Sequence, residues 1–309
     1  MTAESFFDRP GVRRATRFAL VIIGAGFLLW ALAVRARSGG RGAGPGAGAD
    51  EVRWIAAAAC AVAALIAPRV ASRAEAIGFF VAALALAARI GADHLGSWAF
   101  RRISVLGAEQ ENEERLLLLH AGWSLVVLGG PLVVGAWLLK TPAPDLLRPP
   151  GPAWKPMLLA LAAGFALYPV LAVATTAVNA LVDGWVGSHA KPWPGWNGAL
   201  HAEVIDADVA RKFRWIALAL AIELPLLEIL LHGVLRQALS RWGVVGFVVG
   251  TAVLAPVVMI SGTMSFFLFG GCIVTGLFAA RTASIVPGFA FWTSLVYGWI
   301  AWGWILPAR

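Results

Sequence analysis

Residues 213–235 read FRWIALALAIELPLLEILLHGVL. From Trp215 to Leu231 this stretch is apolar except for Glu223 and Glu228, and His232 follows directly. About 20 predominantly apolar residues are enough for a helix to cross a bilayer. A charged group at the centre of such a span costs about 2.5–3.5 kcal/mol on insertion scales, so an acid there is a functional candidate. The stretch therefore predicts a membrane helix that carries polar chemistry.

The composition of the whole chain agrees with this. Of 309 residues, 60% are apolar and 14% are charged, whereas soluble domains average about 45–50% apolar and about 25% charged residues. An ordinary soluble domain and a disordered chain are both excluded. The net charge of +8 does not indicate nucleic-acid binding, because the basic residues lie mostly between apolar runs, where they set topology and contact lipid. Cys60 and Cys272 lie inside apolar stretches, which favours packing over a disulfide framework or metal site; no cofactor is expected.

The apolar runs predict an all-α, polytopic helical membrane protein with eight or nine transmembrane helices. They lack the alternation of a membrane barrel. We divide the chain into an N-terminal membrane region of about five spans, 1–212, and a four-span bundle, 213–309. A bacterial inner membrane is the expected location. The runs cover residues 18–34, 52–67, 76–90, 116–139, 156–178, 213–231, 243–261, 265–280 and 285–306.

Several segments between or within these runs have their own interpretation. The first run is typical of a retained signal anchor rather than of a cleaved signal peptide, and the Gly-rich segment 38–49 of a flexible linker. A helical hairpin is expected around Pro68. Residues 91–115 are expected to form a solvated helical connector. The tryptophans and prolines of 183–212 are typical of a loop that lies in the headgroup layer.

Orientation is poorly determined by the basic residues. We favour an inside amino terminus, because the first charge cluster often dominates, but the loops on the two sides hold similar numbers of Lys and Arg. With the amino terminus inside, the inside loops hold Arg69, Arg73, Lys140, Arg148, Lys155, Arg236, Arg241 and Arg281.

The spacing of Glu228 and His232 carries the chemistry. Residues four apart share one face of a helix, so the two side chains can hydrogen-bond. A carboxylate beside an imidazole can activate water as a general base, or the pair can neutralise itself while holding helices together. Both interpretations remain open. Glu223 lies about one turn earlier and can reach the cavity into which Glu228 would point. A metal site would need a further histidine beside Glu223, Glu228 and His232.

Residues 224–235 resemble the first motif of the CPBP family of intramembrane proteases, which includes CAAX-processing and bacteriocin-immunity (Abi) proteins. That motif reads Glu-Glu-x-x-x-Arg-Gly. Residues 276–285 resemble the Gly-rich helix end of the family and its Arg-Thr-Gly-Ser turn, so the resemblance covers about residues 213–300. It implies a helical bundle around a polar cavity, with Glu228 at the second glutamate of the motif as a catalytic candidate; His232 is a candidate by its spacing from Glu228, and Glu223 as a substitute for the missing first glutamate. The implied partners are membrane lipid and a transmembrane or lipid-modified protein substrate.

This chain departs from the family pattern at several motif positions. The first glutamate of the family falls on Leu227 and its arginine on His232. The histidine of the second motif falls near Val258 or Met259, that of the third falls on Trp292, and no histidine follows His232 in the sequence. In the family these groups are taken to activate water and stabilise the oxyanion, and the loss of several members of such a unit leaves little catalysis.

Three functions therefore follow as hypotheses. The favoured one is a catalytically degenerate relative, a pseudoenzyme, that binds membrane segments of partner proteins. The second is an active intramembrane endopeptidase that uses Glu228 to activate water, and the third a small-solute transporter, for which an internal repeat is missing. In either of the first two we expect residues 213–306 to form four helices around a cavity, with Glu228 facing inward and His232 near its mouth. Polar side chains that could substitute for the missing groups, or simply join helices, are Ser261, Thr263, Thr293, Ser294 and Tyr297.

Overall fold

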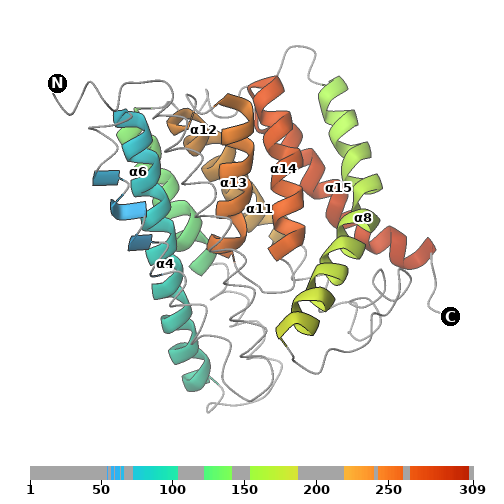
Figure 1. The fold of residues 1–309 in the computed structure, drawn as a ribbon, viewed down its shortest axis with the longest axis horizontal. Coiled ribbons are helices and arrows are strands. Elements are labelled where there is room, and N and C mark those ends of the chain that lie inside the picture. The colour runs from blue at the N-terminus through green and yellow to red at the C-terminus, as the bar shows by residue number, and fades with distance from the viewer. Residues whose placement is uncertain are drawn as a thin grey trace.

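The computed structural model is built from helices in every part of the chain that it describes (Figure 1), which confirms the all-α prediction at that level. The predictions for the run 18–34, the linker 38–49, the turn at Pro68 and the loop after residue 186 lie outside this part. The described residues are 54, 57–58, 60–62, 64–65, 72–103, 122–140, 154–186, 219–239, 243–259 and 265–305.

Three helical segments of the N-terminal region are long and apolar enough to cross a membrane: Arg73–Ala92, Gly122–Leu139 and Trp154–Val178. The first lies in α4, whose full length carries the helix well into the expected polar connector. The second contains a wider π-helical turn, η1, ahead of α6, and the third lies in α8. The bounds are Arg73–Ile103 for α4, Leu125–Gly129 for η1, Gly130–Leu139 for α6 and Trp154–Val186 for α8.

The four apolar runs predicted after residue 213 all correspond to helices. The first is one interrupted helix over residues 219–239 that alternates between π and α geometry, and three further helices follow it. The interrupted helix comprises η2 (Ala219–Glu223), α11 (Leu224–Glu228), η3 (Ile229–Val234) and α12 (Leu235–Ala238), and it is followed by α13 (Gly243–Met259), α14 (Ser265–Thr282) and α15 (Val286–Ile305).

Pro225 accounts for the irregular start of the interrupted helix. It is the second residue of α11, which follows the π turn of η2 directly. Proline has no N–H and its ring crowds the preceding turn, so a wider turn there keeps the chain helical without a sharp break. The second π segment, η3, contains His232, and such π turns often occur at functional sites.

Contacts between distant residues set the directions of the helices. Ser124 bonds to Glu223, and the position of Gly135 lies against Val234, so the helix of η1 and α6 runs parallel to the interrupted helix. In the same way, contacts of Leu161 with Ser294 and of Phe165 with Trp302 make α8 parallel to α15. One group of helix ends lies toward the top of Figure 1: the start of α4, the end of α6, the start of α8, and α12.

Candidate functional site

Glu228, the last residue of α11, lies in the interior of the bundle. Its side chain is 1% exposed, and its Oε2 lies 2.7 Å from Nδ1 of His232. That distance fits a hydrogen bond from Nδ1–H to the carboxylate. The predictions that the two residues share one helix face and that Glu228 faces inward are confirmed.

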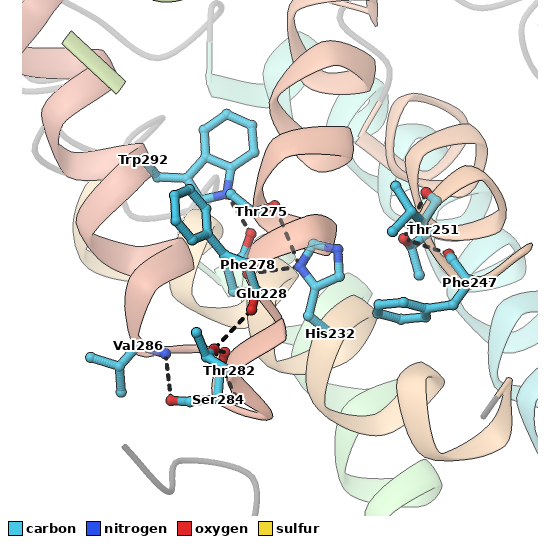
Figure 2. Close-up of polar contacts among 11 residues, drawn as sticks. Glu228, His232, Phe247, Thr251, Thr275, Phe278, Thr282, Ser284, Val286 and Trp292 are labelled. Carbon is cyan, nitrogen blue, oxygen red and sulfur yellow. Dashed lines mark hydrogen bonds and ion pairs between the residues drawn. The ribbon is translucent and has the colours of Figure 1, made fainter. Parts of the chain in front are cut away.

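The second oxygen of Glu228 is held by a tryptophan from another helix. The indole N–H of Trp292, on α15, donates to Glu228 Oε1 over 2.6 Å, and the Trp292 side chain is 2% exposed (Figure 2). The apolar sequence of the last span does not by itself predict this contact. A sequence signal for it exists, because position 292 is where the resemblance to the family expects a histidine.

Two glycines allow the helices to approach this closely. A Cβ on Gly288, in the first turn of α15, would collide with the carboxylate of Glu228. A Cβ on Gly271, on α14, would collide with the six-membered ring of Trp292. The absence of these side chains lets α14 and α15 close around the acid, so the cluster is shaped by three helices.

The imidazole of His232 is as deeply buried as the acid. Its ring meets Phe247 edge to face at a centroid distance of 5.7 Å, and Thr275 Oγ1 lies 3.5 Å from Nδ1. Its Nε2 has no hydrogen-bond partner and faces Gly276. The expectation that His232 lies near the mouth of a cavity is wrong, because its side chain is only 1% exposed.

Glu223 does not join the cluster of Glu228, His232 and Trp292. It accepts a hydrogen bond of 2.7 Å from the hydroxyl of Ser124, which belongs to the helix of η1 and α6. The two acids are five residues apart, and with about 3.6 residues per turn they point about 140° apart around a regular helix. The expectation that Glu223 reaches the same cavity is therefore wrong.

The other candidate polar groups serve packing or lie at the surface. Ser294 donates to the backbone carbonyl of Leu161 and so joins α15 to α8, while Tyr297 and Thr293 are exposed. Val258 is fully buried in the apolar core, and so is Cys272, as expected for packing residues. Ser261, Thr263 and the side chain of Met259 lie outside the described part of the chain.

The turn between α14 and α15 is held by its own hydrogen bonds. Ala283 adopts a left-handed backbone with φ of 57°, and its position is the one at which the family turn has glycine. The Thr282 hydroxyl accepts from the N–H of Ser284, and the Ser284 hydroxyl accepts from the N–H of Val286, the first residue of α15. This turn places Gly288 against the carboxylate of Glu228.

The arrangement provides a closed set of hydrogen bonds around one acid. Both carboxylate oxygens already accept from side-chain donors, which is the state expected of a buried polar group that stabilises packing. Among the described residues, no group of three or more His, Cys, Asp or Glu side chains could hold a metal ion. Comparisons of the chain with protein-family models, with curated proteins and with solved structures find no match.

Proposed function

We propose that this chain is a CPBP-like, multi-pass membrane protein, with eight or nine spans, in which the catalytic acid has become part of a closed structural cluster. Its function is to bind membrane segments of partner proteins without cleaving them. It resides in a bacterial inner membrane. The observation that carries the proposal is the engagement of both Glu228 oxygens, by His232 at 2.7 Å and by Trp292 at 2.6 Å.

A general base must hold the water that it activates within about 2.6–3.2 Å. The most direct approaches to Glu228 are taken by the imidazole and the indole, and the acid is almost fully buried. The Trp292 indole is also bulkier than the histidine that the family pattern has at this position, and it fills the space beside Glu228 Oε1. These features favour loss of catalysis on a retained bundle.

Binding of a partner segment is supported by the exposed apolar side chains of α8. Within its apolar span only a small share of the residues is covered by the rest of the protein. In a bilayer, such a face contacts lipid or a second helix, and helix pairs associate there through close packing. Its exposed large apolar side chains are Trp154, Leu158, Leu159, Leu161, Phe165, Val170 and Leu181.

The test is a cleavage assay on the full-length protein in liposomes, with prenylated and transmembrane peptides as substrates. We expect no cleavage by the unmodified protein. The family pattern is then restored with Leu227→Glu, His232→Arg, Trp292→His and either Val258→His or Met259→His. Activity that appears in the restored protein alone supports a lost active site, and robust cleavage by the unmodified protein that requires Glu228 contradicts the proposal.

One observation favours the active endopeptidase as a second candidate. His232 is paired with Glu228, and its Nε2 is buried without a partner, as in a dyad that awaits a water or a substrate group. If the protein is a protease, Glu228→Gln should abolish cleavage while the protein still inserts and accumulates, because the amide cannot accept the proton of the attacking water. Undiminished cleavage by the Gln variant excludes Glu228 as the base.

A further inference from the structure

One end of the helical bundle carries a cluster of basic residues, which we call the basic end. Each member lies in the first or last turn of its helix or caps it, and all but one are exposed, Arg236 being half-buried. The members are Arg73 of α4, Lys140 at the end of α6, Lys155 of α8, Arg236 of α12 and Arg281 of α14.

The helix directions bring these residues to the same end. The end of α6 follows the contact of Gly135 with Val234, so Lys140 lies at the same end as Arg236. The end of α14 leads through the short turn at Ala283 into α15, whose first turn meets Glu228 of the same interrupted helix. Because α8 is parallel to α15, its start and Lys155 lie at that end too, as does the start of α4 (Figure 1).

Among the described residues of the basic end, one acid stands against the five cations. The acid there is Glu75, which is 1% exposed and bonded to the hydroxyl of Ser72. At the opposite end, the described helices carry Arg101 and Arg102 of α4 together with Asp93 and Asp183. Among the described residues, positive charge is therefore in excess at the basic end, whereas the four positions named at the opposite end hold two basic and two acidic residues.

Helix dipoles account for part of this pattern. A cation at the end of a helix is stabilised by the negative end of the dipole, which suits Lys140, Arg236 and Arg281. Arg73 and Lys155 lie in the first turns of their helices, where the dipole disfavours a cation. Glu75 supplies negative charge in the first turn of α4, whereas the first turn of α8 holds no acid, so Lys155 is the cation whose position calls for an anion beyond its own helix.

Lys155 also has the surroundings of a membrane-interface residue. Its Nζ lies 5.5 Å from the ring centroid of the neighbouring Trp154, and both side chains are exposed. Tryptophan is enriched at the level of the lipid headgroups, so this pair marks the depth at which the basic end meets the bilayer surface.

We infer that the basic end binds the headgroups of anionic phospholipids and faces the cytoplasmic leaflet. The inference rests on the proposed function to the extent that the chain must span a membrane. Anionic lipids attract basic residues close to the surface, and an excess of Lys and Arg at the ends of spans favours the cytoplasmic side.

Lipid selectivity is tested on the full-length protein in phosphatidylcholine liposomes that contain spin-labelled phosphatidylglycerol or spin-labelled phosphatidylcholine. We expect the protein to restrict the anionic label preferentially. The double variant Lys140→Glu/Lys155→Glu should weaken this preference by about fivefold per residue, equivalent to about 1 kcal/mol for each lost cation. The matched control, Arg101→Glu/Arg102→Glu, makes the same change of charge at the opposite end and should retain the preference.

Equal loss of preference in both double variants, or no preference in the unmodified protein, contradicts the lipid assignment. Raising the salt concentration should reduce the preference, since headgroup contacts at the surface are screened. Inorganic phosphate in the buffer should not compete with the lipid headgroups for the basic end, because a lipid surface holds many negative charges close together and a free ion does not. Full competition by phosphate would contradict the assignment of a lipid ligand.

Orientation is tested with single cysteines and an impermeant thiol reagent in a Cys60→Ala background, where the buried Cys272 is retained. Lys140→Cys should react in inverted vesicles and Leu95→Cys, beyond the end of the α4 span, in intact cells. If Lys140→Cys reacts in intact cells and Leu95→Cys in inverted vesicles, the cytoplasmic assignment is wrong although the chain spans the membrane. Labelling of both from the same side contradicts the multi-pass proposal itself.

Discussion

Two acids of the same interrupted helix, Glu228 and Glu223, have different surroundings. Glu228 is 1% exposed and accepts hydrogen bonds at both oxygens, from His232 and Trp292. Glu223 is half-buried and accepts from Ser124. The comparison shows that the face of the helix, rather than its apolar sequence, decides whether an acid becomes part of the core or joins a neighbouring helix near the surface.

The two acids also differ in what their loss would leave behind. Around Glu228, removal of the carboxylate deprives the imidazole of His232 and the indole N–H of Trp292 of their acceptor, and both groups are buried. Around Glu223, removal of the carboxylate takes away the acceptor of the Ser124 hydroxyl in a part-buried setting. Because an unsatisfied buried group costs more than a typical hydrogen bond contributes, the cluster at Glu228 is the stronger determinant of stability.

Glu228→Ala should lower the free energy of unfolding more than Glu223→Ala, and this difference should be the greatest of those proposed. Glu228→Ala leaves two buried groups without their acceptor, at about 1–3 kcal/mol each, whereas the hydrogen bond from Ser124 that Glu223→Ala removes contributes about 0.5–1.5 kcal/mol. The free energy of unfolding of each variant is measured by titration of SDS into detergent-solubilised protein. Equal losses in the two variants would show that the two acids contribute equally to stability.

A smaller effect is expected from Trp292→Phe, which retains a large aromatic ring but removes the donor to Glu228. We expect a loss of about 1.5–3 kcal/mol, since a charged acceptor is left unsatisfied. Trp302→Phe is the matched control, because the Trp302 indole donates to the backbone carbonyl of Phe165 at the exposed side of the α8–α15 contact. The control should lose about 0.5–1.5 kcal/mol. A control that is destabilised as much as Trp292→Phe would assign the effect to ring packing instead of the hydrogen bond.

The smallest effect is a gain of stability from Ala283→Gly. Ala283 has φ of 57°, and a left-handed backbone costs a residue with a Cβ about 1–2 kcal/mol, so we expect a gain of about 1 kcal/mol. Ala280→Gly, in the last turns of α14, should instead lose about 0.8–1.0 kcal/mol.

The turn positions α15 against Glu228. The same SDS titration of Ala283→Gly in the Glu228→Ala background therefore tests whether the turn and the cluster contribute independently to stability. A loss of stability in Ala283→Gly itself would mean that the left-handed geometry is not adopted.

The contact between Glu228 and His232 could be predicted from the sequence because it is local. Residues four apart meet on any helix, whatever surrounds it. The same reasoning misled at Glu223, where nearness along the chain was taken as nearness in space. The contact of Trp292 with Glu228 spans 64 positions, and it depends on how deeply α15 packs, which Gly271 and Gly288 permit.

The amino-acid sequence is enough to predict that the chain forms apolar helices and that one of them carries two acids followed by a histidine, because length, hydropathy and helical spacing are local properties. The tertiary structure alone decided which donors close on Glu228, which helix receives Glu223 and which cations gather at one end of the bundle. Those outcomes depend on the rotation and direction of each helix. Many side chains on several helices set these together as they pack, so a short stretch of sequence does not encode them.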